Sequence, residues 1–183
     1  MNRIRPGADC RGVNDELLVI RCQLGEREAF AELVRAWHDP VRGYLRRMLD
    51  DDRSDDVAQE VWLAVFRALP GLREPARFAP WLFTIARRAV TDRLRAHYAQ
   101  PAPPEAEPED DPADLLLDRI ALTEALNTIP PREREVLILF HLQDLSLEDC
   151  AEICGVPAGT VKSRLSRARK LLRAQLEEKG YTP

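Results

Sequence analysis

The stretch "GVPAGTVKSRLSRARKLLRA", Gly155 to Ala174, decides the fold of the last part of the chain. At about 100° per residue its apolar side chains share one narrow arc of a helix, which we expect to face a core. They are Val161, Leu165, Ala168 and Leu172. The opposite arc is cationic, with six basic residues and no acid from Lys162 to Arg173, although the formal net charge of the chain is -4. A solvated helix face normally mixes both signs of charge, so this pattern predicts a surface that binds a polyanion.

The residues before this helix predict a second, shorter helix and a sharp turn. Ser146, with Asp149 three residues later, is typical of a helix start. Gly155 suits the left-handed turn that ends such a helix, and Pro157 suits the first turn of the next one. The pair predicts a helix-turn-helix whose second helix lies in the DNA major groove, although an ordinary helical hairpin has the same turn signals.

Length and composition allow one domain of ordinary size or two small ones. The chain has 183 residues, of which 45% are hydrophobic. No apolar run approaches membrane-spanning length, and the first twenty residues lack the apolar core of a signal peptide, which favours a cytoplasmic protein without membrane insertion. From roughly Asn14 to Tyr98 helical periodicity continues and no strand-like alternation interrupts it, so the sequence predicts an all-α protein.

A proline-rich acidic segment divides the chain. The stretch "QPAPPEAEPEDDP", 100–112, holds five prolines and five acids and nothing that could build a core. We expect a tail over 1–13, an N-terminal helical domain over 14–98, a linker over 99–113 and a C-terminal helix-turn-helix domain over 114–180.

One helix of the N-terminal domain has an unusual polar face. In "DDVAQEVWLAVFRAL", 55–69, the apolar arc comprises Val57, Ala58, Val61, Trp62, Ala64, Val65, Phe66 and Leu69. On the other side, steps of four, three and four residues align Asp56, Glu60, Leu63 and Arg67, with Gln59 beside them. An exposed leucine with a charged rim favours an interface for a protein partner, and a solvated face with one stray leucine is the alternative.

The next helix carries a second basic face. In "APWLFTIARRAVTDRLRAH", 79–97, the core side comprises Trp81, Leu82, Ile85, Ala86, Ala89 and Val90, and the opposite face Thr84, Arg87, Arg88, Thr91 and Arg95. Two cationic faces joined by a spacer suggest that one nucleic acid is held at two places. The loop "PGLREPARF", 70–78, has apolar and arginine side chains that could hold an unstacked base, and an ordinary connector is the alternative.

The sequence predicts no metal, no cofactor and no catalytic site of its own. Cys150 and Cys154 could be combined with His141 and with Cys10 or Cys22, but no CxxC pair is present, and both fit buried positions of a helix. The histidines have no evident catalytic partners, and we expect His97 and His141 to be structural.

Taken in order, three motifs resemble the extracytoplasmic-function sigma factors of bacterial RNA polymerase. They are "DDVAQEVWLAVFRAL", "RFAPWLFTIARRAVTDRLR" and, after the acidic gap, "IPPREREVLILFHLQDLSLEDCAEICGVPAGTVKSRLSRARKLL". The resemblance implies two helical domains that bind core RNA polymerase and direct it to promoters. It covers nearly all of the chain except the first dozen residues and the linker.

The resemblance also implies roles for individual residues. Asp56, Gln59 and Glu60 would dock on the polymerase, and Leu63 and Arg67 share their stripe. The −10 promoter element would meet Leu72, Arg73, Glu74 and Arg77 in the loop and Arg87, Arg88, Thr91 and Arg95 on the next helix. The −35 element would meet Thr160, Lys162, Ser163, Arg164, Arg167, Arg169 and Lys170 on the last helix.

The implied partners are core RNA polymerase, promoter DNA and an anti-sigma factor, which is often membrane-anchored in this family. Two other functions fit parts of the chain. A helix-turn-helix regulator that is not a polymerase subunit would explain only the last domain. A helical adaptor for proteins would explain only the stripe from Asp56 to Arg67.

Overall fold

The structure is a computed structural model that describes residues 8–49, 54–98 and 122–181. The described residues are helical, with no strand among them, which confirms the all-α prediction. The proposed linker lies outside these residues. The elements are α1 (Ala8–Gln23), α2 (Arg27–Met48), α3 (Ser54–Ala68), the 3-10 turns η1 (Leu69–Gly71) and η2 (Pro75–Arg77), α4 (Phe78–Tyr98), a helical segment over 122–127, α6 (Pro131–His141), α7 (Leu147–Cys154) and α8 (Ala158–Glu178).

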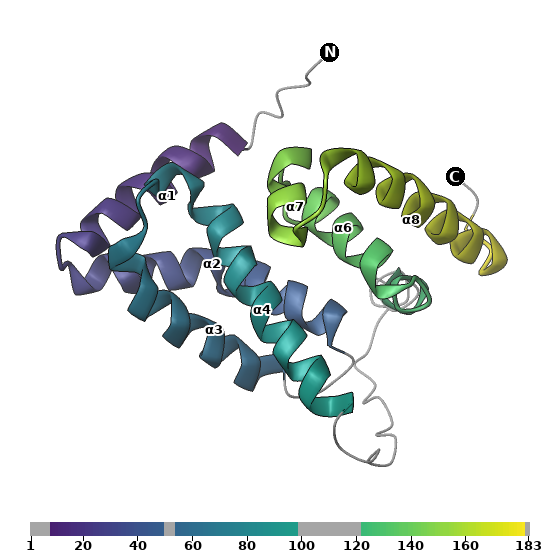
Figure 1. Ribbon diagram of the computed structural model, residues 1–183, viewed down its shortest axis with the longest axis horizontal. Coiled ribbons are helices and arrows are strands. Elements are labelled where there is room, and N and C mark those ends of the chain that lie inside the picture. The colour runs from purple at the N-terminus through teal and green to yellow at the C-terminus, as the bar shows by residue number, and fades with distance from the viewer. Residues whose placement is uncertain (1–7, 50–53, 99–121, 182–183) are drawn as a thin grey trace.

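Helices α1 to α4 pack together in the N-terminal domain (Figure 1), and aromatic side chains form the centre of their contact. Trp37 of α2 meets Phe78 and Phe83 edge to face, with ring centroids 5.9 and 6.1 Å apart. Tyr44 lies about two turns further along the same face of α2, and its ring centroid is 5.5 Å from that of Phe83. The buried Trp37 indole donates a hydrogen bond to Asp15 of α1 at 3.0 Å, so its polar atom is satisfied inside the domain.

Two aromatic residues lie where the helical arcs did not place them. Phe66 was expected in the core arc of α3, but 62% of it is exposed, and its ring rests edge to face on Phe30 at 5.1 Å. The prediction was wrong because α2 and α4 already bury the other side of α3, leaving Phe66 beyond the edge of that contact. Phe83 was not assigned to the core side of α4 and is fully buried, since α2 covers a wider arc of α4 than expected.

The predicted helix-turn-helix forms from α7 and α8. Ser146 and Asp149 make a reciprocal capping box at the start of α7. Gly155 ends that helix in the left-handed conformation, with φ 65°, and its N–H is directed to carbonyls of the last turn. On α8 the residues Val161, Leu165 and Ala168 are buried, so the predicted apolar arc does face a core. These local predictions are confirmed.

The C-terminal domain lies directly against the N-terminal one (Figure 1). Helix α7 contacts α4, and α6 lies between α8 and α2. Seven consecutive residues of α6, from Glu133 to Leu139, are therefore buried although three of them are charged.

Candidate nucleic-acid and partner interfaces

The polar stripe of α3 is exposed along its whole length. Asp56, Gln59, Glu60, Leu63 and Arg67 all face solvent, in the alignment that their spacing predicts. Leu63 is 55% exposed, and its neighbour Phe66 extends the apolar part of the stripe. Sequence reasoning missed Phe66 here, although its spacing of three residues from Leu63 was a usable signal. The stripe is therefore an apolar pair with an acidic and a basic rim, which suits a protein partner.

A groove of about 550 Å³ runs between α3 and α4. Glu60 lines it from α3, and Arg88, Asp92 and Arg93 line it from α4. Arg88 was assigned to the −10 set together with Arg87, but the two side chains leave α4 on different sides. Arg88 shares its surface with the polar stripe of α3.

The loop between α3 and α4 is held at both ends. Gln23 at the end of α1 donates to the carbonyls of Leu69 and Leu72, at 3.2 and 2.8 Å. Leu72 is half-buried, whereas Arg73 and Glu74 are exposed. Arg77, the last candidate residue of the loop, is directed at the other domain, where it pairs with Asp149 at 3.1 Å and Glu152 at 2.5 Å.

The remaining candidate residues of α4 are already engaged within the protein. Arg87 donates to Glu135 of α6 at 2.9 Å. The Thr91 hydroxyl donates to the carbonyl of Arg87, and Arg95 pairs with Asp92 at 3.7 Å on the exposed surface. Burial, the largest single influence, lowers the pKa of the Arg87 guanidinium, but the surrounding groups together, led by the Glu135 carboxylate, raise it overall. Arg87 is therefore held as a cation at the boundary between the domains.

The cationic face of α8 remains open to solvent. Lys162, Ser163, Arg167, Arg169 and Lys170 are exposed, and Thr160 and Arg164 are half-buried. Two of the arginines also contact α6. Arg167 donates to Glu133 at 2.9 Å while its side chain stays 68% exposed. Arg169 donates to His141 at 3.1 Å and lies over the Phe140 ring. These contacts with α6 orient the two arginine side chains and leave the cationic face of α8 accessible to solvent.

The cysteines have the chemistry of buried thiols. Burial raises the pKa values of Cys150 and Cys154 to about 12, and the Cys154 thiol donates weakly to Glu135 at 3.7 Å. A thiol that stays protonated is a poor metal ligand and a poor nucleophile. Within the described ranges no three His, Cys, Asp or Glu side chains gather into a group that could hold a metal ion.

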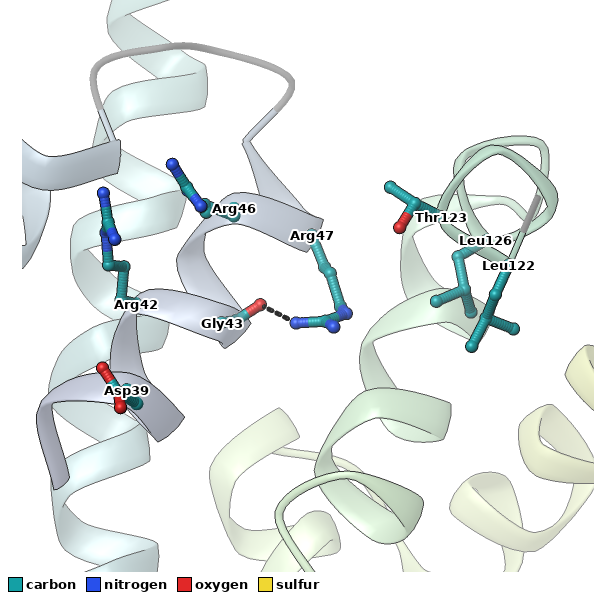
Figure 2. Close-up of a pocket in the computed structure, with 8 residues that line it drawn as sticks. All are labelled: Asp39, Arg42, Gly43, Arg46, Arg47, Leu122, Thr123 and Leu126. Carbon is teal, nitrogen blue, oxygen red and sulfur yellow. Dashed lines mark hydrogen bonds between the residues drawn. The ribbon is translucent and has the colours of Figure 1, made fainter. Parts of the chain in front are cut away.

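A second cavity, of about 600 Å³, lies beside α2 (Figure 2). Asp39, Arg42, Gly43, Arg46 and Arg47 line it from α2, and Leu122, Thr123 and Leu126 from the helical segment over 122–127. Arg47 lies on the side of α2 that faces the leucines, and its guanidinium turns back to donate to the carbonyl of Gly43 at 2.7 Å. Arg42 is held by Asp55 at 2.5 and 2.8 Å. The boundary between the domains is therefore not packed along its whole length.

Comparison with known proteins identifies both domains. Sigma-70 region 2 matches residues 33–99, and Sigma-70 region 4 matches residues 119–172. The chain is 30% identical to the ECF RNA polymerase sigma-E factor of Haemophilus influenzae, over 90% of its own length and 96% of that protein. The chain belongs to the ECF RNA polymerase sigma factors. It is also 32% identical to the RNA polymerase sigma-H factor of Pseudomonas aeruginosa, over 89% of its own length and 94% of that protein.

A solved sigma factor has the same architecture. The sigma factor RpoE from Bartonella quintana, crystallised with the anti-sigma factor NepR, matches with a TM-score of 0.70 and 26% identity, over 81% of this chain and 96% of that one. The predicted family and function class are thus confirmed: this is an RNA polymerase sigma factor with region 2 in the N-terminal domain and region 4 in the C-terminal one. No described helix of this sigma factor is both long enough and apolar enough to span a membrane.

Proposed function

We propose that this sigma factor uses three separate faces: α3 for core RNA polymerase, the loop and α4 for the −10 element, and α8 for the −35 element. The observation that carries the proposal is the open cationic face of α8 on a capped helix-turn-helix. Its side chains have the donors that phosphates and major-groove base edges accept. The catalysis belongs to the polymerase, and the sigma factor needs neither a metal nor a cofactor of its own.

The polymerase would bind the stripe of α3. Leu63 and Phe66 would supply apolar contact area, and Asp56, Gln59, Glu60 and Arg67 would orient the partner. Arg88 would contact both the polymerase and the −10 strand, because it lines the groove between α3 and α4 together with Glu60.

The promoter would be read at two places. Leu72, Arg73, Glu74 and Arg77 would receive an unstacked base of the −10 element, and Arg87, Arg88, Thr91 and Arg95 would hold the melted strand. The exposed residues of α8, with Thr160 and Arg164 behind them, would enter the major groove of the −35 element. Joining the two readers in one chain raises the effective concentration of the second once the first is bound.

A separate anti-sigma factor would inhibit this protein, as the complex of the Bartonella relative suggests. Because its proposed targets are a polymerase and chromosomal DNA, we propose that the protein acts in the cytoplasm.

The direct test is run-off transcription from a library of genomic fragments with core polymerase and this protein together. We expect defined transcript starts only when both are present, preceded by two short shared elements at a constant spacing. If core polymerase gains nothing while the protein alone still shifts duplex DNA, the chain acts as a helix-turn-helix regulator and the α3 assignment is wrong.

A substitution on α3 sharpens this test. Leu63→Asp introduces a charge into the proposed apolar contact and should abolish both polymerase binding and transcription. Leu17 of α1 is equally exposed, at 55%, so Leu17→Asp is the matched control and should leave both unchanged. Equal losses in the two variants would contradict the assignment.

A further inference from the structure

A side chain of α1 holds the loop between α3 and α4 from outside. Gln23 is the last residue of α1, and it is exposed. Its amide nitrogen donates to the carbonyl oxygens of Leu69 at 3.2 Å and of Leu72 at 2.8 Å. These two partners lie 46 and 49 residues further along the chain. One amide group therefore ties the end of α1 to both ends of the turn from Leu69 to Leu72.

The contact with Gln23 lies directly beside the exposed tip of the loop, which is formed by Arg73 and Glu74. On the other side of this tip, the backbone N–H of Arg77 donates to the carbonyl of Glu74 at 2.9 Å. The carbonyls that precede and follow the tip are those of Leu72 and Glu74. Both are therefore held, one by Gln23 and one by the loop itself.

Gln23 acts on the part of the loop that has the most backbone freedom. Pro70 and Pro75 each fix their own φ near about −65°, which leaves most of the rotation to residues 71–74. The side chain of Leu72 is half-buried and packs on the core, and α1 packs on both 3-10 turns. The amide of Gln23 thus restrains the one stretch that neither proline nor apolar packing fixes.

The need of backbone groups for partners does not account for this side chain. The Leu69 carbonyl already accepts the N–H of Leu72 at 3.1 Å. The contact between Gln23 and the Leu72 carbonyl is exposed, so water could take the place of the amide there. Water cannot fix the distance between the loop and α1, whereas a side chain anchored on a helix can.

We propose that Gln23 is a positioning residue for −10 recognition: it holds the loop in the conformation in which Leu72, Arg73 and Glu74 receive an unstacked base. The inference rests on the proposed function of the loop. A loop that is held before binding loses less conformational entropy when the base arrives. The apparent affinity for the base therefore rises with the fraction of molecules whose loop is already in place.

Abasic nucleotides separate base capture from phosphate binding. The probe is a labelled single strand with the −10 element that run-off transcription maps, together with a series in which each base in turn is replaced by an abasic site. Fluorescence anisotropy measures binding to the full-length protein in complex with core polymerase. Both kinds of strand keep the same phosphates, so the ratio of their affinities reports the contribution of the missing base. The position with the largest ratio in the wild-type complex is the captured base.

Gln23→Met keeps the length of the side chain and removes its N–H donors. We expect it to lower the ratio at the captured base about fivefold, which is the order of one hydrogen bond, and to leave binding of the abasic strand unchanged. Gln23→Lys returns a donor of sufficient reach and should restore the ratio, while its charge strengthens binding of both strands equally. Gln175→Met is the matched control and should change neither, since the Gln175 amide donates within α8, to Glu178 at 3.5 Å.

An unchanged ratio in Gln23→Met would overturn the proposal. So would equal losses for the intact and abasic strands, because a side chain that only supports the fold would weaken both. A ratio that Gln23→Lys does not restore would also contradict it, since the donors would then not be what matters. If no abasic position weakens binding to the wild-type complex, the loop captures no base, and it is the −10 assignment of the proposed function that fails.

Discussion

The two basic helix faces of this sigma factor, on α4 and on α8, have similar residues and different surroundings. On α4 the half-buried Arg87 donates to a carboxylate of the other domain. On α8 Arg167 also pairs with a glutamate, but that residue belongs to its own domain, and the arginine stays 68% exposed. Positive charge on a helix is thus not sufficient for an open cationic surface. The side chains that the neighbouring domain places opposite the charge decide how accessible each arginine is.

The largest expected effect tests what supports the α8 face. Leu165 is 3% exposed beneath it, and Leu165→Ala should lower the free energy of unfolding of the C-terminal domain by about 3 kcal/mol through lost burial and a cavity. Denaturant unfolding followed by helical circular dichroism measures this. Leu171, 37% exposed on the same helix, is the control, and Leu171→Ala should cost clearly less. Equal costs would mean that the apolar arc does not form a core.

Charge reversal on the open face should have the next largest effect. Lys162 is exposed on α8, and Lys162→Glu should weaken duplex promoter binding by about tenfold or more and lower the salt-dependence slope by about one. Fluorescence anisotropy at several salt concentrations measures both. Arg35→Glu makes the same charge change on exposed α2 and should have a minor effect. If both variants weaken binding equally, the α8 face has no special role.

The turn between α7 and α8 sets the angle of the open face. Gly155 has φ 65°, where a side chain is strained although space is available, so Gly155→Ala should destabilise the domain by about 1 kcal/mol. Gly159 lies in the first turn of α8 with open space around it, and Gly159→Ala should be neutral or stabilising. Thermal unfolding of the two variants should therefore move in different directions, and matching shifts would contradict the turn geometry.

The smallest expected effect concerns the two buried cysteines of α7, Cys150 and Cys154. Burial raises the pKa values of Cys150 and Cys154 to about 12 from an ordinary value of 9.0, so the folded protein keeps protons that the unfolded chain loses. The free energy of unfolding should thus be unaffected below pH 9 and fall as pH rises from there to about 12. At pH 9.5 the loss is about 1 kcal/mol per thiol. Cys154→Ala should make the fall shallower, and an unchanged pH profile would show that this thiol is not protected.

Much of the C-terminal domain was predictable from local sequence. The capping box at Ser146, the left-handed Gly155 and the buried arc of α8 each follow from contacts within a few residues. The α3 stripe was predictable for the same reason, since its members are aligned by helical spacing alone.

Contacts between distant segments were not predictable in this way. Helical spacing placed Arg87 on a polar face correctly but gave no sign that Glu135, 48 residues away, would cover it. Helical spacing also could not show how much of α3 its neighbouring helices bury, and Phe66 lies outside the buried part. A usable signal for the covered face was the run of charges that opens the otherwise apolar α6, because buried charges need partners.

The most direct test of the central claim is the binding of the free Arg87→Ala and Arg167→Ala proteins to duplex promoter DNA, measured by fluorescence anisotropy. We predict that Arg167→Ala weakens binding by about tenfold, because this side chain is 68% exposed on α8, and that Arg87→Ala leaves binding unchanged, because Glu135 holds its guanidinium. Equal losses in the two variants would show that the contact with the other domain does not decide which arginine reaches DNA.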